Sequence, residues 1–424
     1  MVFDNDALRE IGFRARQASI ELSKTSGHLR NLALLKIADA LCDRKDEIID
    51  ANFIDIDVAK SNSLSDSMVD RLILNSERID QISIDVRNVV NLNDPIGRME
   101  DTKILSNGLQ VARKRVPLGV IGAIFESRPN VIIDISVLCI KSGNSVILRG
   151  GSEAINTNSK IFQVLRDAVS ELEIPIDALQ FIESTDREIV TQLLLMKDYI
   201  DLLIPRGGGA LIRRVSNEAT MPVITGGIGV CHTYVDRSAN LEMAENVVDN
   251  AKTHRPTVCN ALDTIIVHSD VASDFLSSLA QLWKPKKVKM LCDRRSLSLL
   301  EPLNLVDAKL AEDQDWDTEH LSLVAGVRIV DSLDEALDHI LIHGSGHSEA
   351  IISEDYSATQ RFLNEVDSSA VMVNTSTRFN DGAQLGLGAE IAISTDKLHA
   401  RGPMGLSELT SYKWIVMGSG QIRK

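Results

Sequence analysis

Val120-Ile121-Gly122-Ala123-Ile124-Phe125 is the stretch that decides the fold, because it is short, almost wholly apolar and rich in β-branched residues. A run of this kind is typical of a strand that is buried on both faces. Further along the chain, similar runs alternate with helical segments; they are Ser145–Leu148, Leu179–Ile182, Ile200–Ile204 and Pro222–Ile224. The alternation predicts βαβ units and a parallel, doubly wound sheet.

A second alternating block follows the first. Its predicted strands are Val230–Val235, Ala261–Val267, Val324–Val330, Ala350–Ile352 and Ala370–Val373, separated by helices such as Leu241–Thr253 and Leu333–His343. The first 95 or so residues show the 3–4 spacing of apolar positions that predicts helices. Two α/β domains in tandem predict a cleft between them. A hinge is expected at 225–229, where three glycines permit unusual backbone angles.

Two β-like segments lie outside both blocks. Lys103–Val116 centres on Ser106-Asn107-Gly108, and an Asn-Gly pair between alternating runs predicts a hairpin. The tail Ser411–Met417 also has a strand pattern. Because a projecting hairpin and a loose terminal strand leave sheet edges that need partners, we expect both to contribute to a homo-oligomer.

Composition excludes several classes of protein. The 424 residues include 45 basic and 60 acidic side chains, a net charge of −15 that opposes nucleic-acid binding. The basic runs Arg113–Arg115 and Lys284–Lys289 are interpreted as solvated faces, and no apolar run approaches the ~20 residues of a membrane span. The five cysteines form no Cys-x-x-Cys, and residues 1–6 lack a leader pattern. We therefore expect a cytoplasmic protein with reduced thiols.

Cys259 is the candidate nucleophile. It lies in Thr253–Thr264, between a predicted amphipathic helix and a β-branched run, with cationic Arg255 close by in the sequence. A thiol at such a junction can be held partly as thiolate and presented to substrate. A free cysteine is more often a small buried apolar residue, which is how we interpret the other four cysteines.

The sequence evidence for a nucleotide-binding site is weaker than that for the nucleophile. No Gly-x-Gly-x-x-Gly follows the first strand, but two predicted strands end in a cation and glycines, Arg149-Gly150-Gly151-Ser152 and Arg206-Gly207-Gly208-Gly209. Taken alone, each is an ordinary βα turn. Together, at the ends of strands in one sheet, they predict binding of a nucleotide's ribose or phosphates.

These segments carry a resemblance over nearly the whole chain. Phe125–Asn130, Ile147–Gly151, Pro205–Gly209, Pro222–His232, the Cys259 segment, Asp381–Glu390 and Leu398–Leu406 are similar, in order, to the γ-glutamyl phosphate reductases, within the aldehyde dehydrogenase superfamily. The resemblance implies an aldehyde dehydrogenase-like α/β fold with two doubly wound domains and a small β oligomerisation element. The implied divisions are an NADPH-binding domain over 1–102 and 117–226, a catalytic domain over 227–395, and the oligomerisation element over 103–116 and 396–424.

The resemblance also implies a reaction, the NADPH-dependent reduction of L-glutamate 5-phosphate to L-glutamate 5-semialdehyde with release of phosphate, in proline biosynthesis. A separate glutamate 5-kinase is a possible partner, since it would supply the substrate. Cys259 would form a thioester, with Asn260 and Arg128 as candidates to stabilise the oxyanion; Arg128 could instead bind phosphate. Ile224 stands where hydrolytic relatives carry a water-activating glutamate, which favours reduction; the same residue could simply be part of the core.

The remaining roles are assigned by the same resemblance. Glu319 would hold the nicotinamide ribose, and Ser152 beside Arg149 leaves room and charge for the 2′-phosphate of NADPH. The cofactor set also includes Gly150, Gly151, Arg206, Gly207, Gly208, Gly226 and Gly227. The substrate set comprises Arg128, Arg255, His343, His347, Asp381 and Gly382. No metal is expected, because two glycines separate His343 from His347 and no third ligand is evident.

Two alternatives stay open from the sequence. A CoA-acylating aldehyde dehydrogenase would share the cysteine and the missing base. A non-catalytic nucleotide- or glutamate-binding module could use the same fold without a reactive thiol.

Overall fold

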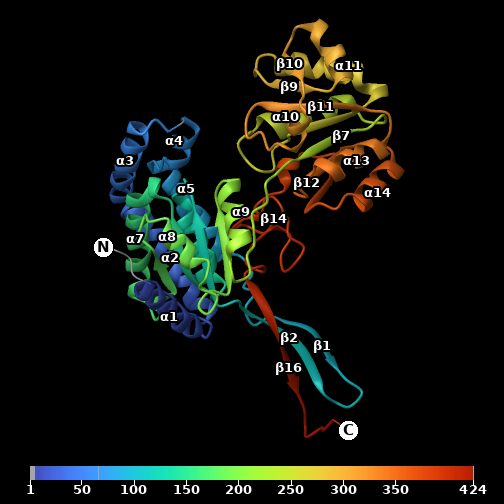
Figure 1. The fold of residues 1–424 in the computed structure, drawn as a ribbon. Coiled ribbons are helices and arrows are strands. Elements are labelled where there is room, and N and C mark those ends of the chain that lie inside the picture. Colours follow the sequence, from blue (N-terminus) through green and yellow to red (C-terminus); the bar gives the residue numbers. More distant parts are fainter. Residues whose placement is uncertain (1–4, 65, 424) are drawn as a thin grey trace. The chain divides into compact units, whose positions relative to one another are not determined.

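The structure, a computed structural model, describes residues 5–64 and 66–423. It divides into two compact units. Unit 1 contains Met1–Gly226, Gly386–Ala392 and Met404–Lys424, and unit 2 contains Gly227–Leu385 and Ile393–Pro403 (Figure 1). The expectation that the chain has no leader depends on residues 1–6, of which 1–4 lie outside the described part.

Unit 1 begins with five helices, as the apolar spacing predicts. They are α1 (Asn5–Leu22), α2 (Gly27–Asp43), α3 (Lys45–Ser61), α4 (Asp66–Leu72) and α5 (Ser76–Val90). Polar side chains cap two of them: Ser26 accepts a hydrogen bond from the Leu29 amide, and Asn75 accepts one from the Arg78 amide. Such caps satisfy amides that have no partner within the helix.

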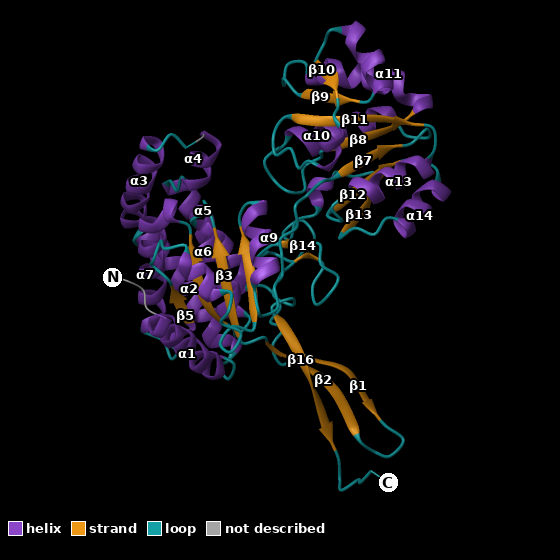
Figure 2. Ribbon diagram, in the orientation of Figure 1, coloured by secondary structure: helices purple, strands orange, loops and turns teal. Residues whose placement is uncertain are grey.

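A four-stranded parallel sheet forms the core of unit 1 (Figure 2). Its order is β5-β4-β3-β6, from β3 (Val120–Phe125), β4 (Ser145–Gly150), β5 (Leu179–Phe181) and β6 (Leu202–Arg206). The linking helices are α6 (Asn130–Lys141), α7 (Ile155–Ser170), α8 (Glu188–Leu193) and α9 (Gly209–Glu218). Apolar residues of α1, α8 and α9 pack on one face of the sheet, and α6 is buried against the other. The predicted strand Pro222–Ile224 is wrong, since only Val223 forms a bridge there, with Leu203.

The predicted hairpin is present as β1 (Met99–Ile104) and β2 (Gln110–Pro117), which pair in antiparallel fashion. The tail forms β16 (Thr410–Met417), but it is not a loose strand. It pairs with β2 of the same chain over its whole length, from Thr410 opposite Pro117 to Met417 opposite Gln110. Figure 1 shows this three-stranded sheet extending away from the helices of unit 1. The tail is therefore not the loose strand expected from the sequence: the hairpin and the tail form one sheet, whose open edges are β1 and β16.

Unit 2 contains a seven-stranded parallel sheet in the order β10-β9-β11-β8-β7-β12-β13. The strands are β7 (His232–Val235), β8 (Thr264–His268), β9 (Lys289–Cys292), β10 (Asp307–Leu310), β11 (Val324–Val330), β12 (Ser348–Ile352) and β13 (Ala370–Val373). The helices are α10 (Leu241–Thr253), α11 (Ser269–Trp283), α12 (Arg294–Leu300), α13 (Leu333–His343) and α14 (Tyr356–Glu365). A small antiparallel pair, β14 (Ile393–Ser394) with β15 (Gly402–Pro403), completes the unit.

Both faces of this sheet are covered by apolar side chains. Val235, Ile265 and Val267 pack with α10 and α11 on one side. Tyr234 and Ile266, their neighbours along the same strands, pack with α13 and α14 on the other side. Alternate residues of a strand point to opposite faces, so two buried faces explain why these strands read as continuous apolar runs.

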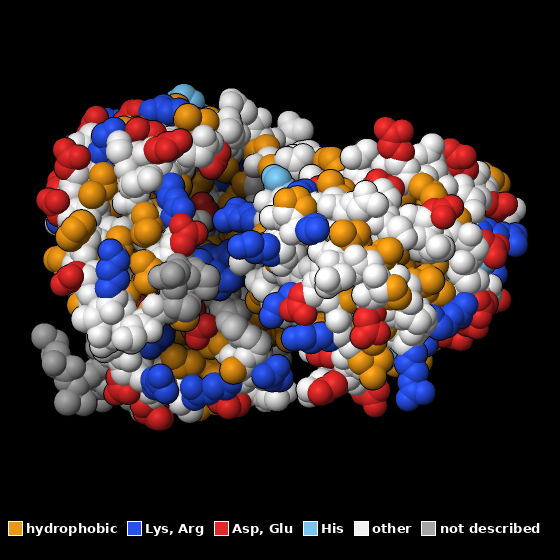
Figure 3. Space-filling model, turned by 90° about the horizontal axis from the view of Figure 1, so that it is seen from above, with side chains coloured by type: hydrophobic (Ala, Val, Ile, Leu, Met, Phe, Trp, Pro, Cys, Tyr) orange, Lys and Arg blue, Asp and Glu red, His pale blue; other side chains and the backbone are white. Residues whose placement is uncertain are grey.

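Charged side chains of both signs cover the surface. Figure 3 shows basic and acidic groups interspersed on the visible face of each unit, in keeping with the 45 basic and 60 acidic residues of the chain. Among the residues that the structure describes, no helix is long and apolar enough to cross a membrane.

The core of unit 2 supplies a stability test with a matched control. Phe275 on α11 is fully buried, whereas Phe53 on α3 is 72% exposed. Phe275→Ala should lower the free energy of unfolding of unit 2 by about 3–5 kcal/mol, because it removes buried apolar area and leaves a cavity. Phe53→Ala should change stability by less than about 0.5 kcal/mol. Urea unfolding followed by far-UV circular dichroism measures both; equal midpoints for the two variants would contradict the assignment of this core.

Candidate functional site

The candidate nucleophile lies at the amino-terminal edge of the sheet in unit 2. Cys259 stands in the loop between α10 and β8. Cys231 immediately precedes β7, and His347 immediately precedes β12. Because β7, β8 and β12 are parallel neighbours, their first residues share one edge, which brings these three residues together. Cys259 is partly exposed, while Cys231 and His347 are fully buried.

Gly229 fixes the backbone of Cys259. A side-chain Cβ at Gly229 would lie 1.6 Å from the Cys259 carbonyl oxygen and 3.0 Å from its Cα, so only glycine permits this approach. The same carbonyl oxygen lies 3.2 Å from the Cys231 thiol, which donates to it. The Gly229 amide in turn donates to Glu319 Oε1 at 3.0 Å. The predicted ribose-binding Glu319 is thus joined to the nucleophile's loop through one glycine.

Asn260 secures the other side of the nucleophile. Its amide Nδ2 donates to the carbonyl oxygens of Asn380, at 2.9 Å, and Arg378, at 3.4 Å. Thr377 donates from its hydroxyl to the Asn260 carbonyl at 2.8 Å. These bonds attach the Cys259 loop to the short helix η5 (Thr377–Phe379). To serve an oxyanion, the Asn260 amide would have to give up one of these carbonyls.

A buried ionic pair lies behind the loop. Burial raises the pKa of Asp263 to about 6, although Lys252 opposes the shift. Burial lowers the pKa of Lys252 to about 8. Asp263 accepts hydrogen bonds from the Cys231 amide at 3.3 Å and the His320 amide at 3.0 Å, so it connects β7 to the segment that carries Glu319. Burial also raises the pKa of the Cys231 thiol, which makes Cys259 the better candidate nucleophile of the two.

The two predicted substrate histidines have different surroundings. His347 Nδ1 lies 2.7 Å from the Ser348 hydroxyl and 3.8 Å from the Cys231 sulfur, and burial lowers the pKa of His347 to about 4. His343 ends α13 and its Nδ1 lies 2.7 Å from Asp317. Only His347 is therefore part of the cluster around Cys231. Among the described residues, no group of three or more His, Cys, Asp or Glu side chains has the arrangement of a metal site.

Three further polar residues stand near the nucleophile, one of which the sequence reasoning missed. The Asp381 carboxylate accepts from the amides of Ala383 and Gln384, so it shapes the turn that contains Gly382. Arg255 is exposed. Arg378, not predicted, interacts electrostatically with Cys259, Arg255 and Asp381. The sequence signal for Arg378 is a lone arginine after a predicted strand, which has no distinctive pattern.

Most of the predicted cofactor residues lie at the carboxyl edge of the sheet in unit 1. Arg149 and Gly150 end β4, and Ser152 begins a short helix, η1 (Ser152–Ala154), where it is exposed. Arg149 is buried except for 8% of its surface, and its Nε has no hydrogen-bond partner. Burial lowers the pKa of this guanidinium, and Glu153 opposes the shift. A buried cation with an unused donor beside two glycines suits an anionic ligand.

The second glycine turn already holds an anion of the protein. The Gly208 amide, at the start of α9, donates to Glu126 Oε2 at 2.9 Å. A Cβ at Gly207 would lie 2.4 Å from the same oxygen. Arg206 ends β6 directly before these glycines. The Glu126 carboxylate thus occupies a place that a cofactor phosphate could take, and the residues present fit a dinucleotide.

The other predicted residues in this part of the sequence are divided between the two units. Arg128 precedes α6 and is partly exposed, and Gly226 is the last residue of the unit's main segment. Gly227 begins unit 2, where its amide donates to the Ile393 carbonyl at 3.0 Å. Ile224 is buried, with 2% of its surface exposed, and its amide donates to the Leu203 carbonyl. Ile224 therefore belongs to the core of unit 1.

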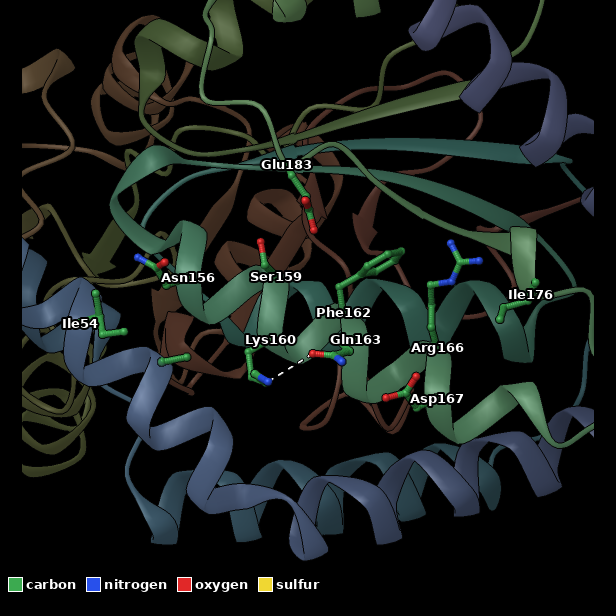
Figure 4. Close-up of a pocket in the computed structure, with 11 residues that line it drawn as sticks. Ile54, Asn156, Ser159, Lys160, Phe162, Gln163, Arg166, Asp167, Ile176 and Glu183 are labelled. Atoms are coloured by element: carbon green, nitrogen blue, oxygen red, sulfur yellow. Dashed lines mark hydrogen bonds between the residues drawn. The ribbon is translucent and has the colours of Figure 1, made fainter. Parts of the chain in front are cut away.

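A cavity of about 600 Å³ lies elsewhere in unit 1, lined by residues of α3 and α7 together with Ile176 and Glu183. Figure 4 shows Lys160 directed at Gln163, with Arg166, Asp167 and Glu183 around the same space. The charged groups on this face of α7 are paired: Lys160 with Glu47, Asp167 with Arg44 and Arg166 with Asp177. None of the predicted site residues lines this cavity.

Comparison with known proteins shows the family to which the chain belongs. The aldehyde dehydrogenase family profile matches residues 4–296. The chain is 51% identical over 411 residues to the γ-glutamyl phosphate reductase of Dehalococcoides mccartyi CBDB1, which covers 96% of both chains. It is 50% identical over 426 residues to that of Clostridium tetani, which covers 99% of both. The crystal structure of the Thermotoga maritima γ-glutamyl phosphate reductase superposes with a TM-score of 0.95 at 43% identity, covering 98% of this chain and 100% of that one.

The family profile and the fold thus define an oxidoreductase of the aldehyde dehydrogenase superfamily. Within it, the chain belongs to the γ-glutamyl phosphate reductase family, the NADPH-dependent reductases of proline biosynthesis. The aldehyde dehydrogenase-like fold and the enzyme class expected from the sequence are therefore confirmed.

Gly229 gives the sharpest test of the site geometry. Gly229→Ala should displace the Cys259 backbone and slow alkylation of Cys259 by iodoacetamide at least about tenfold, because a Cβ cannot coexist with the carbonyl 1.6 Å away. Gly405→Ala is the control, since its Cβ would meet ordinary contacts of 3.4 Å or more. Peptide mass spectrometry resolves the five thiols. If folded Gly229→Ala is alkylated at Cys259 at the wild-type rate, the conformation of the loop does not depend on this glycine.

Proposed function

We propose that Cys259 is the catalytic nucleophile in the reduction of L-glutamate 5-phosphate to L-glutamate 5-semialdehyde, a reaction with NADPH as reductant and phosphate as second product. The observation that carries this assignment is the partly exposed thiol, whose backbone is held from both sides by Gly229 and Asn260. A nucleophile must be positioned within a few tenths of an ångström of its attack geometry, and a loop fixed in this way achieves that.

The reaction proceeds in two stages on Cys259. The thiolate attacks the acyl carbon, a C–S bond forms, and the C–O bond to phosphate breaks with its electron pair, which leaves a thioester. When bound, NADPH supplies the hydride that reduces this thioester. The resulting thiohemiacetal collapses to the aldehyde and restores the thiolate. The tetrahedral state formed by thiolate attack and the thiohemiacetal both carry oxyanion character. The Cys259 amide and the Asn260 side chain are the proposed hydrogen-bond donors to that oxygen.

The proposed NADPH-binding residues supply complementary charge. Arg149 and Ser152, at the end of β4, would hold the 2′-phosphate and ribose; Gly150 and Gly151 allow close approach. Arg206, Gly207 and Gly208 would receive the pyrophosphate once Glu126 leaves the Gly208 amide. Gly226, Gly227 and Glu319 complete the proposed set, and Glu319 is held by the Gly229 amide.

The proposed substrate-binding residues differ in how far they are buried. Arg128, Arg255 and His343 have exposed surface and can meet the substrate's anionic groups directly. Asp381 and Gly382 form a turn beside Arg378 that suits the amino-acid end of the substrate. His347 is fully buried and would act indirectly, by packing against Cys231.

Replacing the thiol tests the proposal directly. Cys259→Ser should fold and bind NADPH but lose roughly 10³-fold or more of its turnover, because an alcohol at neutral pH is a far weaker nucleophile than a thiolate. Cys42→Ser, at another partly exposed cysteine, should keep full activity. NADPH oxidation is measured with freshly generated glutamyl phosphate. If Cys259→Ser retains more than a few per cent of turnover, the nucleophile is another residue.

The acyl acceptor separates this function from CoA acylation. In the oxidative direction, inorganic phosphate should support NADP⁺ reduction by glutamate semialdehyde, and CoA should not. A CoA-dependent rate would identify an acylating dehydrogenase, and no rate with either acceptor, together with an unreactive Cys259, would indicate a binding module.

We further propose that the sheet β1-β2-β16 is an oligomer contact in a cytoplasmic enzyme that receives its substrate from a glutamate 5-kinase. The domain divisions expected from the sequence, with 103–116 and 396–424 as the oligomerisation element, are part of this proposal. Its support is an apolar face: Tyr412, Trp414 and Val416 alternate along β16 and are 46%, 57% and 58% exposed. A face of this kind with an open strand edge is expected to be covered by a second copy.

Charges on that face should disrupt the assembly. Trp414→Glu combined with Val416→Glu should reduce the particle mass in multi-angle light scattering, because an interface core does not tolerate unpaired charge. Tyr356→Glu, on α14 and 77% exposed, should leave the mass unchanged. A folded double variant with the wild-type mass would remove β16 from the interface.

A further inference from the structure

Arg378 is held beside the nucleophile by the backbone. Its carbonyl oxygen and that of Asn380 both accept from Asn260, the residue directly after Cys259. Thr377, directly before Arg378, donates its hydroxyl to the Asn260 carbonyl. Asn380 is itself fully buried and donates to the Ser348 hydroxyl at 2.9 Å. The residues on both sides of Arg378 are therefore attached to the Cys259 loop and to the start of β12.

The Arg378 guanidinium forms no close ion pair with any carboxylate in the part of the chain that the structure describes. Its Nε is buried without a hydrogen-bond partner, and across residues 5–64 and 66–423 no carboxylate lies within 4.0 Å of its nitrogens. Asp381 attracts it but is committed to the amides of its own turn. Burial lowers the pKa of this guanidinium; Asp381 and Cys259 oppose the shift, while Arg255 adds to it. Arginine nevertheless stays charged, so a partly buried cation awaits an anion.

The local helix cannot supply that positive charge. Cys259 follows α10, which ends at Thr253, so the loop leaves the electronegative end of a helix. A thiolate and a phosphate in this loop need compensation from cationic side chains. Arg255 and Arg378 interact electrostatically with each other, which places two positive groups at the same end of the sheet as the nucleophile.

We propose that Arg378 binds the phosphate group of the acyl phosphate beside Cys259 and, before substrate arrives, favours the thiolate form of that cysteine. This inference depends on the proposed function. The phosphate is bonded to the carbon that the thiol attacks, so the group that receives it must lie close to Cys259. Guanidinium N–H groups match phosphate oxygens in pairs and stabilise the charge that departs with the leaving group as the C–O bond breaks.

The oxidative reaction isolates this role, because phosphate is then a free co-substrate. Arg378→Gln should raise the KM for inorganic phosphate at least about tenfold, since it removes hydrogen bonds to a charged group. The KM values for NADP⁺ and for glutamate semialdehyde should change less than about threefold. Arg378→Lys should recover part of the phosphate affinity, since it keeps the charge and loses the paired geometry. Arg294→Gln, at an exposed arginine on α12, is the matched control.

A second readout does not depend on turnover. The pH at which iodoacetamide alkylation of Cys259 is half-maximal should move upward in Arg378→Gln and stay unchanged in Arg294→Gln. At the same concentration, inorganic phosphate should slow this alkylation in the wild-type enzyme, slow it less in Arg378→Lys and not slow it in Arg378→Gln. The measurement on Arg378→Lys keeps the test decisive if the glutamine variant does not fold.

Several outcomes would overturn the inference. An unchanged KM for phosphate with unchanged protection by phosphate excludes Arg378 as its ligand. A raised KM for glutamate semialdehyde alone would assign Arg378 to the substrate's carboxylate instead. If the wild-type enzyme reduces glutamyl phosphate but the Arg378 variants keep the wild-type KM for phosphate and the wild-type protection, only this inference fails. If the wild-type enzyme does not reduce glutamyl phosphate, the proposed function itself fails.

Discussion

The close approach of Gly229 to the carbonyl of Cys259 is the contact on which the site depends. It lets the segment before β7 lie against the loop before β8, where an alanine Cβ would meet the Cys259 oxygen at 1.6 Å. The same glycine holds Glu319 through its amide, and the Cys259 carbonyl is bonded to Cys231. One backbone position therefore sets the relation between the proposed nucleophile, the buried second thiol and the proposed ribose-binding carboxylate.

The two units use opposite edges of their parallel sheets. In unit 1 the glycine turns stand at carboxyl ends of strands, where helices begin and their amides favour anions. In unit 2 the proposed nucleophile Cys259 stands at the amino-terminal ends of strands, where a helix ends. Backbone dipoles thus assist the proposed phosphate sites of unit 1 and oppose a thiolate in unit 2. In unit 2, arginine side chains supply the positive charge that helix amino termini supply in unit 1.

Sequence periodicity predicted most central strands because burial on both faces produces continuous apolar runs, as in β3 and β11. It missed β9 and β10, which lie towards one edge of their sheet and carry charged residues; β9 begins at Lys289, the end of the lysine run interpreted as a solvated face. The tail strand was recognised by its alternation, but its pairing with β2 was not. Pairing depends on a partner some 300 residues away, which local pattern does not encode.

Sequence patterns suggest roles for residues whose chemistry is local, but they do not show contacts that the fold assembles. The segments of Cys259 and Arg149 predict a thiol nucleophile and an anion site, and both roles stay predictions. The importance of Gly229 depends on a carbonyl thirty residues later, and that of Arg378 on hydrogen bonds to Asn260. Asn260 shows the same limit, since its amide reads as an oxyanion donor but is engaged by two backbone carbonyls. A side chain's neighbours decide whether its donors remain available, so function resides in the contacts as much as in the residue type.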